Sequence, residues 1–276
     1  MTVQRPSEPD DRNAVLADLW MDRPSPARMY DYFLGGKDNF QVDRDAADQL
    51  DKAAGPGTTS TVAWENRHFL QRAVACLAEA GIDQFVDIGA GLPTQGNVHE
   101  IAQRVNPAAR VAYVDNDPIV LTHGRALLAD DKTTQVFTAD MREPQAIFTA
   151  PGLTGLIDFS RPVAMLFVAV LHFVRDEEDP YGIVGTFHDA MAPGSYLVLS
   201  HVTTDGPSGD LLARNEDVYK RSTASSRPRS RDEIARFFNG LDLLEPGLVR
   251  PGEWRPGSGQ ETVTHFMYAG VGAKTA

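Results

Sequence analysis

The chain has 276 residues and the composition of a globular protein, with 42% hydrophobic and 23% charged residues. Its 26 Lys and Arg are outnumbered by 38 Asp and Glu, and the formal net charge of −12 argues against unassisted binding to nucleic acid or to an anionic membrane. The single cysteine, Cys76, excludes a disulfide framework and a cysteine-rich zinc site, so we expect a reducing, cytoplasmic location. No apolar run reaches the roughly 18 residues of a membrane span, and residues 1–20 are too polar for a signal peptide.

The first part of the chain is predicted to be a flexible arm followed by a helical cap. The arm, residues 1–26, combines prolines with mixed charges and contains one short predicted helix over 13–19. In the cap, residues 27–81, apolar residues recur at helical spacing. This pattern predicts helices over 27–34, 43–52 and 64–80, and a loop over 58–61.

Two glycine signals mark the ends of these helices. Gly35 and Gly36 open a turn, in which Asp38 is the expected N-cap of the following helix. Gly81 is the expected C-cap that ends the third helix.

Residues 82–276 are predicted to form an α/β domain, because short apolar runs alternate with helical stretches. The expected strands cover 84–88, 110–114, 135–138, 162–168 and 196–202, and the expected helices between them cover 97–104, 118–129 and 181–191. This alternation indicates a doubly wound, mostly parallel sheet covered on both faces. Two further helices over 210–222 and 231–239, the second opened by the capping box Ser230–Glu233, precede late strands near 248–249 and over 263–271. The late strands predict an antiparallel edge.

Small and acidic residues follow three of the predicted strands. Asp87 precedes Gly89 and Gly91, whose missing side chains allow a tight turn close to a ligand. Asp115 follows the second strand, and Asp140 follows the third. Each residue alone has an ordinary explanation as a turn or a cap. Because parallel strands end at the same edge of a sheet, where ligands bind, the three together predict a nucleoside-containing ligand.

The chemistry of these positions favours one kind of nucleoside. A pyrophosphate-binding loop needs a small third residue, whereas Thr94 occupies that place after Pro93, and the nearby carboxylate of Asp87 suits a ligand with an ammonium and a sulfonium group. Asp140 can accept a hydrogen bond from an adenine amino group while Met141 covers the ring. The sequence therefore predicts S-adenosylmethionine as the cofactor.

Several segments resemble known proteins. The run 86–91, with Asp115 and Asp140, resembles the class I, Rossmann-like S-adenosylmethionine-dependent methyltransferases. More specifically, five segments resemble a bacterial subgroup of S-adenosyl methyltransferases long classed as a domain of unknown function: 27–40, 65–70, 87–94, 240–247 and 268–272. Pro93 departs from the pattern, because many methyltransferases have glycine there.

This resemblance implies a Rossmann-like doubly wound, mostly parallel sheet with an antiparallel edge strand and an N-terminal helical cap. It implies methyl transfer to a small-molecule acceptor. The implied cofactor contacts are Asp87, Gly89 and Gly91 for the methionine part, Asp115 and Asn116 for the ribose, Asp140 and Met141 for the adenine, and Ala169 near the transferring methyl group. Arg67 is the candidate partner of the methionine carboxylate, although a surface arginine would look the same in sequence.

The cap helices are further expected to form a lid, with Tyr30, Tyr32, Lys37 and Asn39 as lining candidates. His172 is the candidate catalytic base, with a purely structural role as the alternative.

The acidic run 176–179 is expected to be solvated, and no metal is predicted. Two other functions are compatible with the sequence alone. One is a non-catalytic, S-adenosylmethionine-binding regulatory protein, and the other is a nicotinamide-dependent oxidoreductase.

Overall fold

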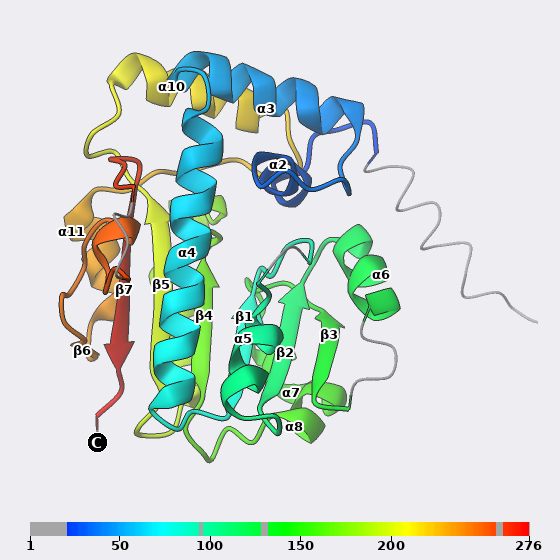
Figure 1. The fold of residues 1–276 in the computed structure, drawn as a ribbon, viewed down its shortest axis with the longest axis vertical. Helices are drawn as coiled ribbons and strands as arrows, with labels where there is room; N and C mark the ends of the chain where they lie inside the picture. Colours follow the sequence, from blue (N-terminus) through cyan, green and yellow to red (C-terminus); the bar gives the residue numbers. More distant parts are fainter. Residues whose placement is uncertain (1–20, 94–95, 128–131, 258–261, 276) are drawn as a thin grey trace, which may run out of the picture.

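The computed structural model describes residues 21–93, 96–127, 132–257 and 262–275. Its strands form one sheet in the order β3-β2-β1-β4-β5-β7-β6 (Figure 1). The strands are β1 (Gln84–Ile88), β2 (Arg110–Asp115), β3 (Thr134–Thr138), β4 (Ala164–Val168), β5 (Tyr196–Val202), β6 (Asp242–Leu243) and β7 (Met267–Ala273). Strands β1 to β5 pair in parallel, whereas β7 pairs antiparallel with β5 and β6. The predicted doubly wound, mostly parallel sheet with an antiparallel edge is confirmed.

Helices cover both faces of this sheet because alternate strand residues point to opposite sides. In β1, Phe85 packs in the same layer as α4 (Thr58–Glu79) and α5 (Val98–Val105), whereas Val86 and Ile88 pack in the opposite layer. The opposite layer contains α7 (Pro144–Thr149), α8 (Pro151–Leu156), α9 (Pro180–Ala190) and α11 (Arg231–Ala235), while α6 (Pro118–Leu127) lies beside β3. Among the described residues, no helix is both long and apolar enough to cross a membrane.

A helical cap lies across the end of the sheet at which β1 to β5 finish (Figure 1). It consists of α2 (Pro26–Phe33), α3 (Gln41–Ala54) and α10 (Gly209–Tyr219). An apolar cluster that includes Met29, Leu50 and Val218 joins these three helices. The sequence places α10 after β5, so a segment far from the N-terminus completes the cap.

Several element boundaries differ from the sequence predictions. Residues 58–61, predicted as a loop, form the first turn of α4, because the Asp51 carboxylate accepts hydrogen bonds from the backbone N–H groups of Gly57 and Thr59. The late strand is β6 rather than 248–249, where Val249 makes only an isolated bridge to Ala269.

Other elements are shorter or were not anticipated. Strand β7 begins at Met267 instead of residue 263, α10 ends at Tyr219, and the helix opened at Ser230 continues after Ala235 as a 3-10 turn. Helices α7 and α8 were not predicted, and each begins at a proline. The helix predicted over 13–19 and the end of the one predicted over 118–129 lie outside the described residues.

The turn between α2 and α3 is held by a residue that the sequence analysis did not single out. The Asp31 carboxylate accepts hydrogen bonds from the backbone N–H of Asp38 and from Asn39 Nδ2. A Cβ atom at Gly36 would lie 1.9 Å from Asp31 Oδ1, so a glycine is required there. Asp38 is not the N-cap of α3, because that position belongs to Phe40.

A buried ion pair fixes the cap internally. Asp43 Oδ2 accepts a hydrogen bond from Arg28 Nε at 2.7 Å, and both side chains are fully buried. The same carboxylate accepts the backbone N–H groups of Ser25 and Phe40, each at 2.8 Å. A single carboxylate therefore joins the start of α2 to the start of α3.

Replacing Asp43 by Asn is expected to destabilise the protein by about 3 kcal/mol, because it removes the negative charge from a fully buried ion pair with Arg28. Chemical denaturation measures this change. Asp45→Asn, on the exposed face of the same helix, serves as the control and should cost less than about 0.5 kcal/mol. Equal losses in the two variants would show that the ion pair does not hold the cap.

Candidate active site

A cavity of about 300 Å³ lies between the cap and the strand ends, at the small end of the usual range for ligand sites. All ten residues proposed from sequence for cofactor binding or catalysis line it: Arg67, Asp87, Gly89, Gly91, Asp115, Asn116, Asp140, Met141, Ala169 and His172. The sheet order explains this convergence, because β1 is flanked by β2 and β4 and all three strands end at the same edge.

The loop after β1 bends around two glycines in the left-handed region. Gly89 has φ 69° and Gly91 has φ 65°. A Cβ on Gly89 would lie 2.1 Å from Val170 Cγ2, so a larger residue would collide with the loop that follows β4. The loop therefore presents backbone instead of side chains to the cavity. Thr94, which argued against a pyrophosphate ligand, lies outside the described residues.

Asp115 ends β2 and holds the neighbouring loops. Its Oδ2 accepts the backbone N–H of Gly91 at 2.9 Å, and its Oδ1 accepts that of Asp117 at 2.8 Å. Burial raises the pKa of Asp115 to about 6, although these hydrogen bonds lower it. Each carboxylate oxygen has a second lone pair, so the side chain can still accept hydrogen bonds from a ligand.

Asp117 connects this edge of the sheet to the cap. Its Oδ1 accepts the backbone N–H of Ile119 at 2.9 Å, so Asp117 caps the start of α6. Its Oδ2 accepts a hydrogen bond from Ser25 Oγ at 3.1 Å, immediately before α2. The sequence analysis considered Asp115 as the cap of α6, and the structure gives that role to Asp117.

Asp87 and Arg67 lie together in the buried part of the cavity. Burial raises the pKa of Asp87 to about 7, while the Arg67 guanidinium lowers it and the Asp115 carboxylate raises it. Arg67 is only 8% exposed, so it is not the surface arginine that the sequence left open. Its Nη2 donates a hydrogen bond to Asn97 Oδ1 at 3.2 Å.

The ends of β2 and β3 meet through a polar contact. Asn116 Nδ2 donates a hydrogen bond to Asp140 Oδ2 at 3.2 Å. The same carboxylate accepts Arg142 Nη1 and the Arg142 backbone N–H, both at 2.9 Å. Arg142, which also lines the cavity, was not predicted; it balances the charge of Asp140.

Ala169 is held in a left-handed conformation, with φ 56°, at the end of β4. Its backbone N–H donates to Ser200 Oγ at 3.0 Å, and that hydroxyl donates to Asn66 Oδ1 at 2.6 Å. Asn66 Nδ2 in turn donates to the Tyr30 hydroxyl at 2.9 Å, which links the sheet to α2. A non-glycine residue in this region costs energy, and such strain is often found at functional sites.

The sequence analysis missed Asn66 and Ser200. Glu65, Asn66 and Arg67 are three consecutive polar residues that are buried in a helix whose other buried residues are apolar. Polar residues at positions that would otherwise be apolar were the sequence signal that could have identified Asn66.

Only one of the four predicted lid residues lines the cavity. Tyr30 does so, whereas Tyr32, Lys37 and Asn39 do not. Tyr32 donates its hydroxyl hydrogen to Asp48, Lys37 is exposed, and Asn39 is bound to Asp31. The turn that carries Lys37 and Asn39 is held by the Asp31 carboxylate of α2.

His172 lies in a 3-10 turn (Leu171–Phe173) after β4 and is 5% exposed. Burial, with the nearby Arg229 guanidinium, lowers the pKa of His172 to about 3, so the ring is neutral at pH 7. Its Nδ1 has no hydrogen-bond partner among the described residues. The His172 carbonyl accepts the backbone N–H of Arg227 at 2.6 Å.

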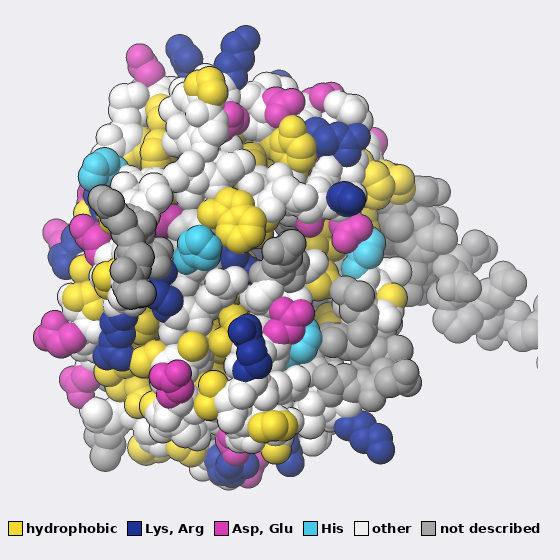
Figure 2. Space-filling model, viewed as in Figure 1, with side chains coloured by type: hydrophobic (Ala, Val, Ile, Leu, Met, Phe, Trp, Pro, Cys, Tyr) yellow, Lys and Arg dark blue, Asp and Glu magenta, His cyan; other side chains and the backbone are white. Residues whose placement is uncertain are grey.

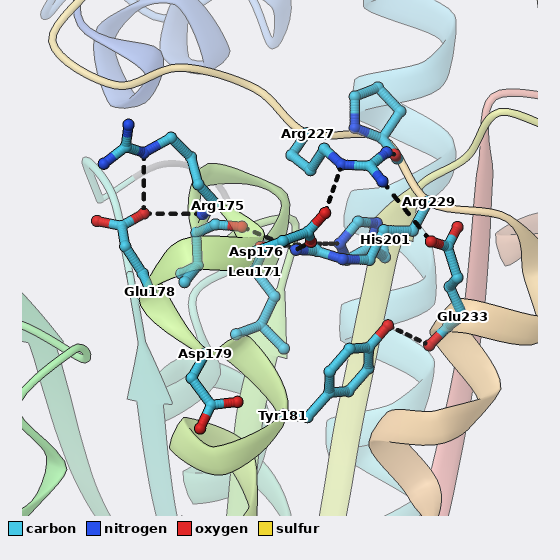
Figure 3. Close-up of polar contacts among 12 residues, drawn as sticks. Leu171, Arg175, Asp176, Glu178, Asp179, Tyr181, His201, Arg227, Arg229 and Glu233 are labelled. Carbon is cyan, nitrogen blue, oxygen red and sulfur yellow. Dashed lines mark hydrogen bonds and ion pairs between the residues drawn. The ribbon is translucent and has the colours of Figure 1, made fainter.

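The acidic run 176–179 makes specific contacts instead of being only solvated (Figure 3). The Asp176 carboxylate accepts hydrogen bonds from Arg229 Nη2 at 2.7 Å and from Arg227 Nε at 3.0 Å. Fully buried Arg229 also donates to the carbonyl oxygen of Leu171, beside His172. Asp179 accepts the backbone N–H of Gly182 and caps α9. The run therefore fixes the segment after α10 next to the histidine.

Comparisons with known proteins show the family of the chain. The family described as S-adenosyl methyltransferase matches residues 13–275. A protein from Thermobifida fusca YX, described as a "putative methyltransferase", is 44% identical, with a TM-score of 0.85 over 92% of this chain and 96% of that one. A DUF574 family protein from Streptomyces avermitilis MA-4680 is 40% identical, with a TM-score of 0.85 over 92% of this chain and 98% of that one. No curated protein matches the chain.

These matches cover nearly the whole sequence, including the cap and the strand ends that form the cavity. They support S-adenosylmethionine as the cofactor and methyl transfer as the activity, and they overrule the nicotinamide-dependent alternative. The chain belongs to the S-adenosyl methyltransferase family.

Proposed function

We propose that the cavity holds S-adenosylmethionine along the ends of β1, β2 and β3, and that a small-molecule methyl acceptor binds beside it under the cap. The observation that carries this proposal is the gathering of Asp87, Asp115 and Asp140 with the glycine loop in one cavity. The cap covers that cavity, which suits a small acceptor better than a polymer. Figure 2 shows acidic and basic side chains interspersed over the face it displays, including the covering elements.

The residues present fit the cofactor. Gly89 and Gly91 form a bend that presents backbone to the cavity, and a Cβ at Gly89 would collide with Val170, which also lines it. Beside it, Asp87 suits an ammonium group and Arg67 a carboxylate, the two charged ends of a methionine moiety. Asp115 and Asn116 are assigned to the ribose hydroxyls, and Asp140 and Met141 to the adenine ring.

When bound, the cofactor supplies a methyl carbon on a positively charged sulfur, and the sulfur is the leaving group when an acceptor atom attacks that carbon in line. The chain's own contribution is to align the acceptor with that carbon and to exclude water. The chain of hydrogen bonds from Ala169 through Ser200 and Asn66 to Tyr30 fixes the wall of the cavity beside Ala169.

His172 is assigned the role of proton acceptor. With its pKa near 3 it is a weak base, so it does not ionise a hydroxyl beforehand. A hydroxyl oxygen that has received a methyl group is strongly acidic, and even a weak base accepts that proton. The neutral ring of His172 is available for this step at pH 7.

Asp115→Ala is expected to weaken the binding of S-adenosylhomocysteine by roughly 1–3 kcal/mol, because hydrogen bonds to the ribose are lost. Isothermal titration calorimetry measures the affinity. Asp189→Ala removes a carboxylate that is 86% exposed on α9 and should leave the affinity unchanged. An unaltered affinity in Asp115→Ala would place the ribose elsewhere, and heat with NAD but none with S-adenosylhomocysteine would overturn the proposed site.

The affinity for S-adenosylhomocysteine should fall by roughly tenfold between pH 8 and pH 6. The carboxyl of Asp87, with a pKa of about 7, is mostly ionised at pH 8 and mostly protonated at pH 6, and the ligand's ammonium group prefers the ionised form. Titration at the two pH values checks this. Asp87→Asn should bind more weakly at pH 8 and lose most of the pH dependence, leaving only the smaller contribution of Asp115, whose pKa is about 6. A wild-type affinity that is the same at both pH values contradicts the contact.

Transfer itself is tested by incubating the protein with methyl-labelled S-adenosylmethionine and fractionated small-molecule extracts. Labelled product in a small-molecule fraction is the expected result. Binding of S-adenosylhomocysteine without any labelled product across broad acceptor pools would favour the non-catalytic regulatory role.

A further inference from the structure

The charged residues that line the cavity are confined to one side of it. Strands β1, β2 and β3 lie on one side of the β1–β4 boundary, and β4, β5 and β7 lie on the other. Among the described residues, the charged lining side chains are Asp31, Arg67, Asp87, Asp115, Asp117, Asp140 and Arg142. Asp31 lies on α2 and Arg67 on α4, and the other five lie at or just after the ends of β1, β2 and β3. The described lining residues from 168 to 267 are uncharged.

We call the uncharged side the acceptor wall and define it by Val202, Leu212, Asn215, Tyr219, Phe266 and Met267. Leu212, Asn215 and Tyr219 come from α10, and the other three lie where β5 ends and β7 begins. Apolar and amide side chains can contact a neutral molecule but cannot neutralise an ionised one.

Helix α10 separates its charges from the cavity. Arg214, Glu216, Asp217 and Lys220 are exposed, and Lys220 Nζ lies 3.0 Å from Glu216 Oε1. None of these four side chains lines the cavity, whereas Leu212 and Tyr219 on the other face of the helix do. The charges of α10 therefore face solvent and offer no counter-charge to a ligand inside.

The surroundings of the wall also disfavour ionised groups. Burial raises the pKa of the Tyr219 phenol to about 12 and raises that of Tyr30. Burial likewise lowers the pKa of His172 to about 3. All three shifts favour the neutral form of the group, whichever sign its charge would have. An ionised group on a ligand placed among these side chains pays the same desolvation cost.

We infer that the acceptor wall selects an uncharged, mainly apolar acceptor molecule. This inference rests on the proposed function, because it assigns the other side of the cavity to the cofactor. A carboxylate or an ammonium group on the acceptor would lose its hydration on entry and meet no opposite charge on the wall. A neutral ring system loses little hydration and gains contact with Leu212, Phe266 and Met267.

The inference is tested with three probes of similar shape and different charge at pH 7: 2-naphthol, 2-naphthoate and 2-naphthylmethylammonium. Calorimetry on protein saturated with S-adenosylhomocysteine is expected to show 2-naphthol binding at least about tenfold more tightly than either ion. Equal or tighter binding of an ion overturns the inference, as does absence of 2-naphthol binding. The preceding titration with S-adenosylhomocysteine reports separately on the proposed function, since failure there concerns the cofactor side alone.

A matched pair of variants locates the selection on α10. Asn215→Asp adds one negative charge to the acceptor wall, and Ala213→Asp adds the same charge at an exposed position of the same helix. We expect Asn215→Asp to lower the affinity for 2-naphthol by about tenfold and to favour the ammonium probe relative to it, while Ala213→Asp changes neither. Both variants should bind S-adenosylhomocysteine as the wild type does, which verifies that they are folded. Wild-type probe affinities in Asn215→Asp would show that α10 does not contact the acceptor. If either variant fails to fold, the comparison of the three probes on the wild-type protein still tests the inference.

Discussion

Buried carboxylates that accept backbone N–H groups are the constraint on which the rest of the structure depends. Asp115 holds the glycine loop through Gly91, and it also holds Asp117. Asp117 binds Ser25 Oγ, and the backbone N–H of Ser25 is bound by Asp43. An ionised carboxylate only accepts hydrogen bonds, so each one fixes the donors around it. This series runs from the sheet to the cap and sets the shape of the cavity without a ligand.

The same burial has an electrostatic cost. The pKa of Asp87 is raised to about 7 and that of Asp115 to about 6, both above the value of about 3.9 expected in an unfolded chain. A raised carboxyl pKa means that the folded protein binds the proton more tightly than the unfolded chain does. The corresponding stability is therefore complete below about pH 4 and is lost as the pH rises through 6 and 7. A positively charged ligand beside Asp87 offsets this loss. The ionised carboxylate therefore lowers the stability of the free protein but favours binding at the point where the cofactor is proposed to lie.

The features that the sequence predicted well are those encoded locally. Asp87, Asp115 and Asp140 each follow an apolar run directly, and parallel strands bring such positions to one edge. The contribution of α10 to the cap could not be predicted, because the contact of Val218 with Met29 and Leu50 joins distant segments. The turn after α2 was mispredicted for a similar reason: Asp38 is a residue type that often caps helices, but the carboxylate that organises the turn belongs to Asp31, which lies on α2.

The two sides of the cavity are held by different parts of the chain. Apart from Asp31, the charged residues that line the cavity lie between Arg67 and Arg142, whereas the acceptor wall comes from residues after β4. Ion pairs of Asp176 with Arg227 and Arg229 fix the segment that follows α10, and this segment contacts the His172 carbonyl. These contacts do not include Asp87 or Asp115. The division of charge across the cavity thus follows from the order of the strands: the carboxylates needed for a cationic cofactor gather on one side, which leaves the other free to be apolar.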